Sequence, residues 1–401
     1  MRIVIIGAGF AGMYAALSAA RLRDIEGVSP AGLEIMLVAP EPTLVIRPRL
    51  YEQNPETLTA PLQDVLAAIN VVYVQGRAEA IDPASHTVEV ATTNGANKSL
   101  SYDRLVVASG SQLFRPNIPG LAEHAFSVDQ LDDAIALDRH LKILTGRPAS
   151  PARDTVVVVG AGFTGIEAAT EIPARLRTIF GADANPRVII IDRNEAVVPD
   201  MGSGPRPIVE DALRKLGIET RLGAGVASLD KSGITLTSGE HIETATVIWA
   251  AGIRANPLTA QIPAERDNFG RLIVDRDLRV PGVAGVFATG DAAKAACDDA
   301  GNFALMSCQH ATRMGAFAGN NAAAELLGVP TRPYHQKAYV TCLDLGDAGA
   351  LFTRGWDRKV EMVGDEAKKT KQEINTVWIY PPRAERAAAL ASANPERVTD
   401  L

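Results

Sequence analysis

The strongest pattern of apolar and polar residues occurs twice, in two separate parts of the chain. Residues 3–12 read IVIIGAGFAG, and residues 156–165 read VVVVGAGFTG. In each copy a run of apolar residues precedes the glycines, and an Ala-rich segment with helical spacing follows them. Uninterrupted apolar strands are typical of a parallel sheet that is covered on both faces. The pattern predicts a strand–turn–helix unit in each half of the chain.

The segments that follow the two copies also correspond to each other. Each half continues with a second apolar strand, then an alternating strand, then an apolar strand that ends in small residues. These segments are residues 34–38, 86–90 and 105–110 in the first half, and residues 187–191, 233–237 and 247–252 in the second. This correspondence between the two halves predicts an α/β fold with two Rossmann-type domains.

Pro-rich segments at residues 115–120 and 146–151 indicate linkers around the second domain. Residues 286–293 read as a strand, a turn and a helix with no counterpart in the second half, so we assign them to the first domain. From residue 331 two short strands, 338–343 and 350–353, and a helix near 364–376 predict a small α+β C-terminal domain. The expected boundaries are 1–117 with 270–330 for the first domain, 121–269 for the inserted second domain, and 331–401 for the third.

The composition is that of an ordinary globular protein of 401 residues, with 47% hydrophobic and 22% charged residues. A net charge of −7 argues against a nucleic-acid partner, which needs clustered Lys and Arg. The first apolar run stops at Gly7, so we interpret it as a strand and not as a signal peptide. No apolar run reaches the ~18 residues of a membrane-spanning helix.

Three cysteines, Cys297, Cys308 and Cys342, show neither C-x-x-C spacing nor a metal-ligand pattern. We therefore expect no metal site, no short redox-active dithiol motif, and a reducing, cytoplasmic compartment.

The two glycine motifs predict dinucleotide binding, because a helix N-terminus presents free backbone N–H groups to a pyrophosphate. The first glycine of each motif permits the tight turn, the second lets the phosphates approach, and the third lets the helix pack on the strand. These are Gly7, Gly9 and Gly12 in the first motif and Gly160, Gly162 and Gly165 in the second.

An acidic residue at the end of the second strand often binds the ribose hydroxyls of a dinucleotide. Asp192 fits this role and favours NADH, because its carboxylate would repel a 2′-phosphate, although the adjacent Arg193 keeps NADPH open as an alternative. The equivalent residue in the first half is Ala39. The nearest acid there is Glu41, which either reaches the ribose through a shifted loop or is a solvated loop residue. Asp291, after Gly290 at a strand end, is either a helix cap or an acceptor for ribityl hydroxyls.

With these motifs the chain resembles the flavoproteins with two dinucleotide-binding domains, and among them the type II NADH:quinone dehydrogenases. The matching segments are Gly7–Gly12, Gly160–Glu167, Ala288–Ala293 and Ser307–Arg313. The resemblance covers residues 1 to about 380. It implies FAD on the first domain, NADH on the second, hydride transfer to flavin N5, and a quinone as the final acceptor, without a protein disulfide.

The resemblance also implies roles for individual residues. Glu167 matches a family glutamate near the nicotinamide, and Lys371 either pairs with it or lies on a solvated helix face beside Lys368. Gln309 and Ala311 match the family segment beside the flavin ring, but Arg313 replaces a family glutamine, which leaves the acceptor in doubt. The catalytic candidates are Glu167, Gln309 and Lys371. The candidates for FAD are Gly7, Gly9, Phe10, Ala11, Gly12, Glu41, Arg47, Ala78, Ala108, Ser109, Gly110, Gly290, Asp291, Gln309, His310 and Ala311. The candidates for NADH are Gly160, Gly162, Phe163, Thr164, Gly165, Asp192, Arg193, Ala251 and Gly252.

The last residues differ from the membrane-binding helices common in this family. Residues 381–401 are rich in Ala, with Leu390, Val398 and Leu401 as the larger aliphatic residues. We therefore expect at most loose contact with the cytoplasmic face of a membrane. Residues 378–380 are interpreted as a buried strand or joint in preference to a lipid contact.

Three further classes of protein stay open as alternatives. One is an NAD(P)H-dependent reductase of a soluble acceptor, such as an iron–sulfur protein or a small electrophile. Another is a redox-sensing flavoprotein that binds a partner. A homodimer is compatible with both of these classes. The third is a sulfide:quinone reductase, which needs a cysteine pair such as Cys308 with Cys297 or Cys342. A disulfide reductase is disfavoured, because residues 13–70 contain no cysteine.

Overall fold

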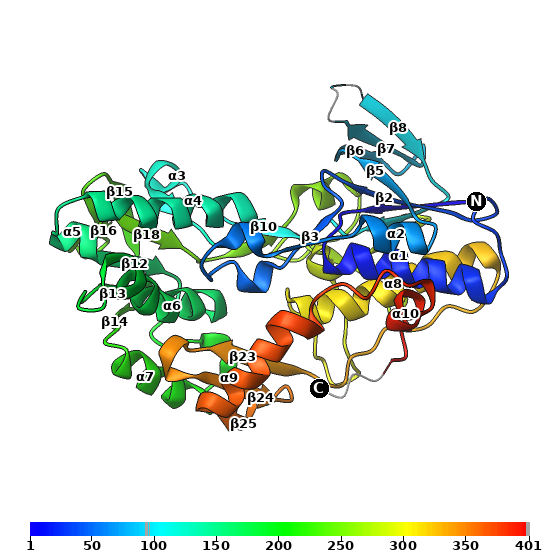
Figure 1. The fold of residues 1–401 in the computed structure, drawn as a ribbon. Helices are drawn as coiled ribbons and strands as arrows, with labels where there is room; N and C mark the ends of the chain where they lie inside the picture. The colour runs from blue at the N-terminus through cyan, green and yellow to red at the C-terminus, as the bar shows by residue number, and fades with distance from the viewer. Residues whose placement is uncertain (93–94, 96, 398–401) are drawn as a thin grey trace.

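The computed structural model describes residues 1–92, 95 and 97–397. Two α/β lobes lie end to end, and the C-terminal strands and helix pack below their junction (Figure 1). We call them lobe 1, which contains the N-terminus, and lobe 2. Among the described residues, no helix has the length and hydropathy needed to cross a bilayer.

Lobe 1 is built on a parallel sheet of five strands whose order is β21-β9-β1-β2-β5. The strands are β1 (Arg2–Ile6), β2 (Glu34–Ala39), β5 (Val72–Gln75), β9 (Arg104–Val107) and β21 (Val286–Ala288). Because β21 pairs with β9, the chain returns to lobe 1 after it has completed lobe 2. The helices of this lobe are α1 (Phe10–Ile25), α2 (Gln63–Ala68) and α8 (Cys308–Leu327).

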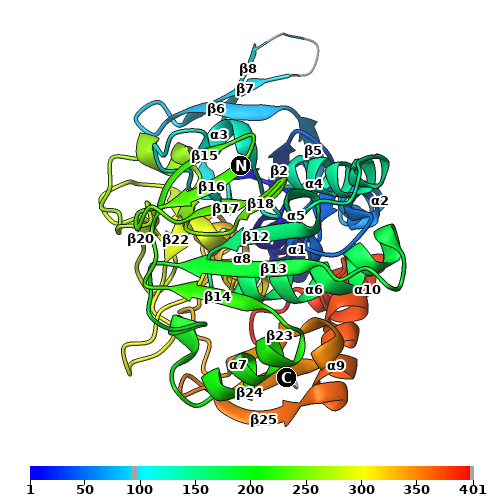
Figure 2. The ribbon, with the colours of Figure 1, turned by 90° about the vertical axis from the view of Figure 1, so that its left-hand side faces the viewer.

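Lobe 2 repeats this architecture with the strand order β11-β18-β12-β13-β14, which Figure 2 shows from its outer side. The strands are β11 (Ala125–Phe126), β12 (Thr155–Val159), β13 (Arg187–Asp192), β14 (Glu219–Leu222) and β18 (Thr246–Trp249). The helices are α3 (Leu121–His124), α4 (Leu131–Ile143), α5 (Pro151–Asp154), α6 (Phe163–Phe180) and α7 (Arg206–Lys215). Two parallel sheets with buried apolar strands confirm the predicted α/β fold class.

Each lobe also carries a small antiparallel sheet, which corresponds to the alternating pattern in the sequence. The strands are β6 (Arg77–Asp82), β7 (Thr87–Ala91) and β8 (Asn97–Ser101) in lobe 1, and β15 (Val226–Asp230), β16 (Gly233–Leu236) and β17 (His241–Glu243) in lobe 2. Where the chain crosses between the lobes, β10 (Ser111–Leu113) pairs antiparallel with β19 (Ile253–Ala255). Shorter pairs are formed by β3 (Thr43–Val45) with β4 (Thr59–Pro61), and by β20 (Leu272–Ile273) with β22 (Ala293–Lys294).

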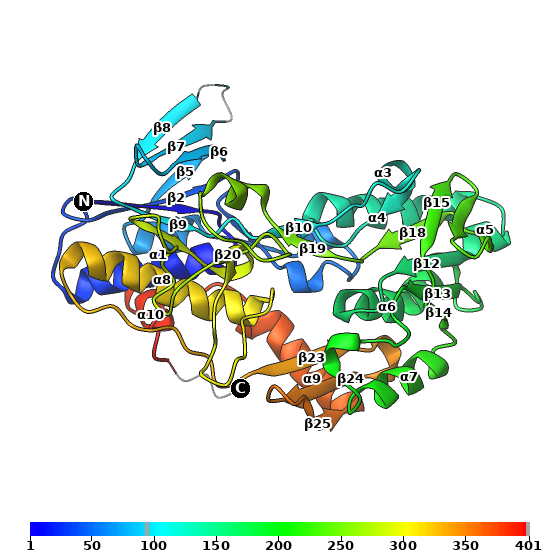
Figure 3. The same cartoon turned by 180° about the vertical axis from the view of Figure 1, so that it is seen from behind.

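Helices α1 and α8 pack unusually close together, as seen from behind in Figure 3. A Cβ atom on Gly315 would lie 2.2 Å from the Ala11 carbonyl oxygen, and one on Gly319 would lie 2.0 Å from that of Ala15. The two helices can approach this closely only because these positions are glycine.

The structure corrects the prediction for residues 286–293. A single 3₁₀ turn, η6 (Gly290–Ala292), follows β21, and the chain then enters β22 instead of a long helix. Backbone pairing with β20 holds this segment extended, and α8 starts only at Cys308, where the Ser307 hydroxyl accepts a hydrogen bond from the His310 N–H.

The C-terminal sheet has one strand more than the sequence predicted. It consists of β23 (Val340–Asp344), β24 (Ala350–Arg354) and β25 (Lys359–Val363), followed by α9 (Gly364–Glu373) and a π-helical turn η8 (Ile374–Trp378). The short helix α10 (Arg386–Ser392) lies against α1 and α2 of lobe 1, with Leu390 buried. Val398 and Leu401 of the predicted tail lie outside the described residues.

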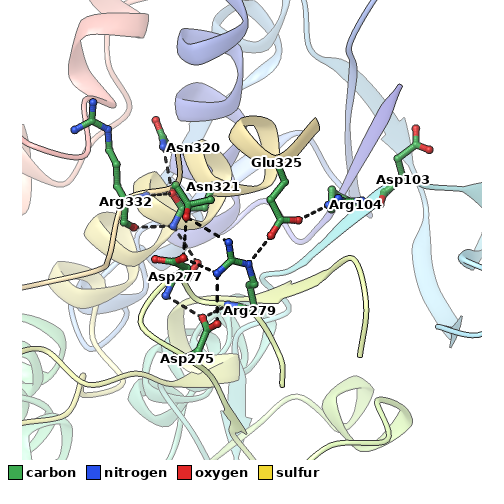
Figure 4. A network of polar contacts seen from close by, with 10 residues as sticks. Asp103, Arg104, Asp275, Asp277, Arg279, Asn320, Asn321, Glu325 and Arg332 are labelled. Atoms are coloured by element: carbon green, nitrogen blue, oxygen red, sulfur yellow. Dashed lines mark hydrogen bonds and ion pairs between the residues drawn. The ribbon is translucent and has the colours of Figure 1, made fainter. Parts of the chain in front are cut away.

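A polar network joins the loop that contains Asp277 and Arg279 to helix α8 of the same lobe (Figure 4). Arg279 pairs with Asp277 at 2.5 Å and with Glu325 on α8. The Asn321 side chain donates to the Asp277 carbonyl at 3.0 Å and to the Arg332 carbonyl at 2.8 Å, and accepts from the Arg332 N–H at 2.9 Å. Every polar group of Asn321 is thus satisfied, which makes this network a structural connection.

Candidate functional site

One cavity of about 2620 Å³ lies where the two lobes meet the C-terminal sheet. Most of the candidates from the sequence line it: Gly7, Gly9, Phe10, Ala11, Glu41, Arg47, Ala78, Ala108, Ser109, Gly110, Gly162, Phe163, Thr164, Glu167, Gly252, Asp291, Gln309, Ala311 and Lys371. The others are outside this lining: Gly12, Gly160, Gly165, Asp192, Arg193, Ala251, Gly290 and His310.

The first glycine turn connects β1 to α1. Gly7 has φ +108°, and a Cβ there would lie 2.4 Å from the Ala108 carbonyl oxygen. A Cβ on Gly12 would lie 1.8 Å from the Gly7 carbonyl oxygen, whereas at Gly9 nothing lies within 4 Å. Gly12 therefore serves helix packing, and Gly9 leaves open space where a pyrophosphate can approach the start of α1.

The second glycine turn, between β12 and α6, has the same geometry. Gly160 has φ +119°, and a Cβ on Gly165 would lie 1.8 Å from the Gly160 carbonyl oxygen. At Gly162 nothing lies within 4 Å. The two turns therefore offer equivalent phosphate sites from opposite lobes of one cavity.

Asp192 at the end of β13 supports the second turn. One carboxylate oxygen accepts a hydrogen bond from the Ala161 N–H at 2.6 Å, and the other accepts from the Asn194 N–H at 2.7 Å. Sequence reasoning had assigned this residue only to a ribose, a role that stays a prediction.

Asp291 lies in a polar cluster next to the first turn. Its carboxylate accepts a hydrogen bond from the Ser111 hydroxyl at 2.6 Å and is 3.6 Å from the Arg47 guanidinium. Arg47 also pairs with Asp129 at 2.6 Å. The Ser109 hydroxyl lines the cavity and is buried without a hydrogen-bond partner among the described residues. These groups suit the hydroxyls and phosphates of a flavin dinucleotide.

Glu167 on α6 and Lys371 on α9 form a buried ion pair. The Lys371 Nζ lies 2.7 Å from Glu167 Oε1 and also donates to the Cys342 carbonyl at 3.0 Å. Only 6% of the Lys371 side chain and 5% of the Glu167 side chain are exposed. The alternative that Lys371 lies on a solvated helix face is therefore wrong.

Burial sets the protonation behaviour of this pair. It raises the pKa of Glu167 to about 7, although the charge of Lys371 opposes the shift. Burial lowers the pKa of Lys371, but the charge and hydrogen bond of Glu167, together with Cys342 and Asp344, outweigh this effect, and the pKa ends above its ordinary value. Lys371 therefore keeps its proton, and Glu167 is the member that can exchange a proton near neutral pH.

A second group of buried charges, which the sequence did not reveal, lies beside this pair. The Asp344 N–H donates to Glu167 at 3.1 Å, and the Asp344 carboxylate binds Lys368 at 2.5 Å and accepts from the Tyr51 hydroxyl at 3.2 Å. Glu171 has no hydrogen bond or ion pair within the described part of the chain, and burial, followed by the charge of Asp344, raises its pKa to about 7. These residues come from three distant segments and share no local motif.

The first turn of α8 closes the cavity from the other side. Gln309 Oε1 accepts a hydrogen bond from the Val340 N–H at 3.4 Å. His310 is fully buried, and burial lowers its pKa to about 3, so its ring is neutral. The alternative of a thiol-based enzyme finds no support here, because burial raises the pKa of Cys308 to about 11 and that of Cys342 to about 12. Within the described residues no cluster of His, Cys, Asp or Glu could hold a metal ion.

Comparisons with known proteins agree with this geometry. The family model described as pyridine nucleotide-disulphide oxidoreductase matches residues 1–315. An NADH dehydrogenase-like protein of Mycobacterium tuberculosis is 49% identical over 397 residues, which are 98% of each chain. The type II NADH:quinone oxidoreductase NdhA of that organism is 33% identical over 318 residues, which are 72% of this chain and 66% of the relative. The solved structure of NDH2 from Plasmodium falciparum in complex with NADH superposes with a TM-score of 0.73 at 16% identity, covering 98% of this chain and 97% of that one.

Proposed function

The chain belongs to the pyridine nucleotide-disulphide oxidoreductase family and, within it, groups with the NADH dehydrogenases, and from this premise we propose that it uses FAD to oxidise NADH and reduces a quinone. The observation that supports this most directly is the pair of equivalent glycine turns, which face one cavity from opposite lobes. Two phosphate sites in one cavity suit a flavin dinucleotide on lobe 1 and NADH on lobe 2.

The FAD ring, when bound, supplies the redox chemistry, since it accepts a hydride from NADH and passes two electrons to an acceptor. The protein's task is to bring the two rings within reach and to exclude water. Gly9 and Asp291 hold the first dinucleotide in this proposal, and Gly162 holds the second. Glu167 and Lys371, which line the same cavity, orient the nicotinamide in this proposal.

The proton balance gives Glu167 a further role. In the reaction NADH + H⁺ + quinone → NAD⁺ + quinol, the hydride carries two electrons and one proton, and a second proton comes from solvent. A buried carboxyl with a pKa raised to about 7 can hold such a proton at neutral pH. No thiol takes part.

Anaerobic addition of NADH to the purified, flavin-loaded protein tests this function. We expect the absorbance of oxidised flavin to disappear within seconds and to return when a quinone is added, with mass spectrometry of the released cofactor identifying FAD. An oxidised spectrum that persists under excess NADH and NADPH would refute the proposal. Stable reduction without reoxidation by any quinone would favour the redox-sensing alternative.

We also propose that the enzyme acts in the cytoplasm with little direct membrane contact. The packing of α10 on lobe 1 supports this, because Ala389 and Leu390 are buried there and Arg386 pairs with Asp24 at 2.6 Å. The large aliphatic residue of this helix, Leu390, is therefore engaged within the protein, whereas Ala387, Ala388 and Ala391 are exposed. Co-sedimentation with anionic vesicles would contradict this part of the proposal.

A further inference from the structure

Acidic and basic side chains are distributed unevenly along the cavity lining. Every acidic residue of the lining lies at or before residue 291. The described residues after 304 that line the cavity, which we call the basic wall, contribute cations and no Asp or Glu. Its basic residues are Arg313, His335, Lys337, Arg358, Lys371, Arg383 and Arg397. This is unusual for a chain with a net charge of −7 and indicates that the basic wall faces a negative group.

Arg358 is the buried cation of the basic wall that has no ion pair among the described residues. It follows the tip of the β24–β25 hairpin and is only 8% exposed. Among the described residues its guanidinium has no ion pair and no carboxylate partner; the Tyr339 hydroxyl is its hydrogen-bond partner, and its backbone N–H donates to the Gly355 carbonyl at 3.2 Å. Its NH1 nitrogen is buried without a partner, and its guanidinium lies over the Tyr339 ring at 4.3 Å.

Other buried arginines of the chain show what Arg358 lacks. Arg175 pairs with Asp138 at 2.6 Å, and Arg271 pairs with Asp267 at 2.8 Å. Arg23 has no acid but donates to three backbone carbonyls, one of them that of Ile69 at 2.6 Å. A buried cation without such partners is costly unless an anion from outside the chain completes the site.

Aromatic rings stand beside this cation. Tyr339 and Trp356 both line the cavity and stack on each other with centroids 4.7 Å apart. The Trp356 indole N–H is buried without a hydrogen-bond partner among the described residues. Aromatic rings beside an unpartnered guanidinium nitrogen and an unpartnered indole N–H suit a flat ring that carries an acidic group.

We propose that the electron acceptor is a quinone with an acidic substituent, and that Arg358 binds this substituent. This inference rests on the NADH:quinone activity proposed above and names its substrate class. Lys337 and Arg397 are exposed lining residues with no ion pair in the described part of the chain, and their positive charges attract an anion to the cavity. A lipid headgroup is the weaker candidate, because only 8% of Arg358 is exposed.

The substituent changes no step of the electron balance. The quinone takes up two electrons and two protons, one proton with the hydride and one from solvent, and the acid keeps its negative charge throughout. Arg358 therefore acts in binding, and its substitution should lower kcat/KM for the anionic acceptor.

Two naphthoquinones that differ in charge test this inference. Steady-state kcat/KM is measured with NADH for 1,4-naphthoquinone-2-sulfonate and for uncharged 2-methyl-1,4-naphthoquinone, and their ratio is compared among variants. In Arg358→Gln we expect the ratio to fall at least about thirtyfold, the lower end of the loss for one partner of a buried charge pair. Arg358→Lys should retain most of the preference, and Lys337→Gln should lower it about twofold, as expected for an exposed charge.

Arg354→Gln is the matched control, because it removes a positive charge from the same hairpin outside the cavity lining. Its ratio should equal that of the wild type. An unchanged ratio in both Arg358→Gln and Lys337→Gln would overturn the inference. So would an equal loss for both quinones together with loss of bound flavin, which would assign Arg358 to the cofactor. Flavin reduction by NADH is measured separately in each variant, so a failure of the proposed activity is distinguishable from a failure of this inference.

Discussion

At the scale of single residues, Glu167 and Glu171 lie one turn apart on α6 and differ in their partners. Glu167 has Lys371, whereas Glu171 is mostly buried and unpaired in the described chain. A carboxyl whose folded pKa lies near 7 binds more protons in the folded than in the unfolded protein between pH 4.5 and 7. The contribution of Glu171 to stability is therefore lost as the pH rises through this window.

We predict that Glu171→Gln stabilises the protein at pH 8, by about 1–3 kcal/mol, and has little effect at pH 5. At pH 5 the wild-type carboxyl is already protonated and resembles the amide. Thermal melts at both pH values measure the difference, with the exposed Glu210→Gln as a control. Equal stabilisation at both pH values would contradict the assignment.

The ion pair of Glu167 leads to a second prediction. Lys371→Met leaves a buried carboxylate without its cation and should cost about 3–5 kcal/mol of unfolding free energy at pH 8. The double variant with Glu167→Gln should recover most of this loss. Urea unfolding of the wild type, the two single variants and the double variant gives the coupling energy of the pair. Additive effects of the single substitutions would show that the two side chains do not interact.

Sequence patterns revealed some of these residues and missed others. The glycines follow from a local motif, and Glu167 was a candidate because the segment Gly160–Glu167 resembles that of a known family. Asp344, Glu171 and Arg358 were missed, because their environments are created by contacts between segments that are distant in the chain. The interpretation of Lys371 stayed divided for the same reason, since neighbouring lysines on α9 look alike in the sequence.

At the scale of elements, the two glycine turns allow a paired prediction. Gly9 and Gly162 have free space for a Cβ, so Ala at either position should leave the melting temperature nearly unchanged. Gly162→Ala should raise the KM for NADH about tenfold with flavin retained, because the methyl group blocks a phosphate. Gly9→Ala should instead release the flavin. Flavin content and NADH titration separate the two, and identical behaviour of the variants would contradict the assignment of one dinucleotide to each lobe.

The element boundaries show where local patterns fail. The parallel strands were predicted well, because burial on both faces produces unbroken apolar runs. The helix expected after Asp291 was wrong, since pairing of β22 with β20 holds that segment extended. Strand β25 was missed although its five residues, KVEMV, alternate between polar and apolar as in a half-buried strand.

At the scale of the whole molecule, a short segment of lobe 1 joins all three parts. The Tyr51 carbonyl accepts a hydrogen bond from Arg175 of lobe 2 at 3.1 Å, and its hydroxyl reaches Asp344 of the C-terminal sheet. Arg175 in turn pairs with Asp138, and Lys142 reaches Asn54 at 3.0 Å.

We predict that Arg175→Met separates the unfolding of the two lobes. The substitution removes the lobe contact and weakens the pairing of Asp138, at a cost of about 2–4 kcal/mol. Calorimetry should then show two transitions where the wild type shows one. Arg187→Met, which removes a surface pair with Glu219 inside lobe 2, is the control. A single transition in Arg175→Met would show that other contacts couple the lobes.

The overall architecture was predictable because it repeats itself in the sequence. The domain boundaries stay predictions, and the approach of α10 to α1 had no sequence signal, since its alanines fit many surfaces.

The insertion of lobe 2 into lobe 1 has a consequence for synthesis on the ribosome. Lobe 2 is continuous in sequence and can fold as soon as its last strand, β18, has emerged. Lobe 1 must wait, because β21 and α8 complete its sheet and cover α1 only after residues 286–327 are made. During that interval the surface of α1 that later receives Gly315 and Gly319 is bare, so the nascent chain stays prone to aggregation until α8, at residues 308–327, has been translated.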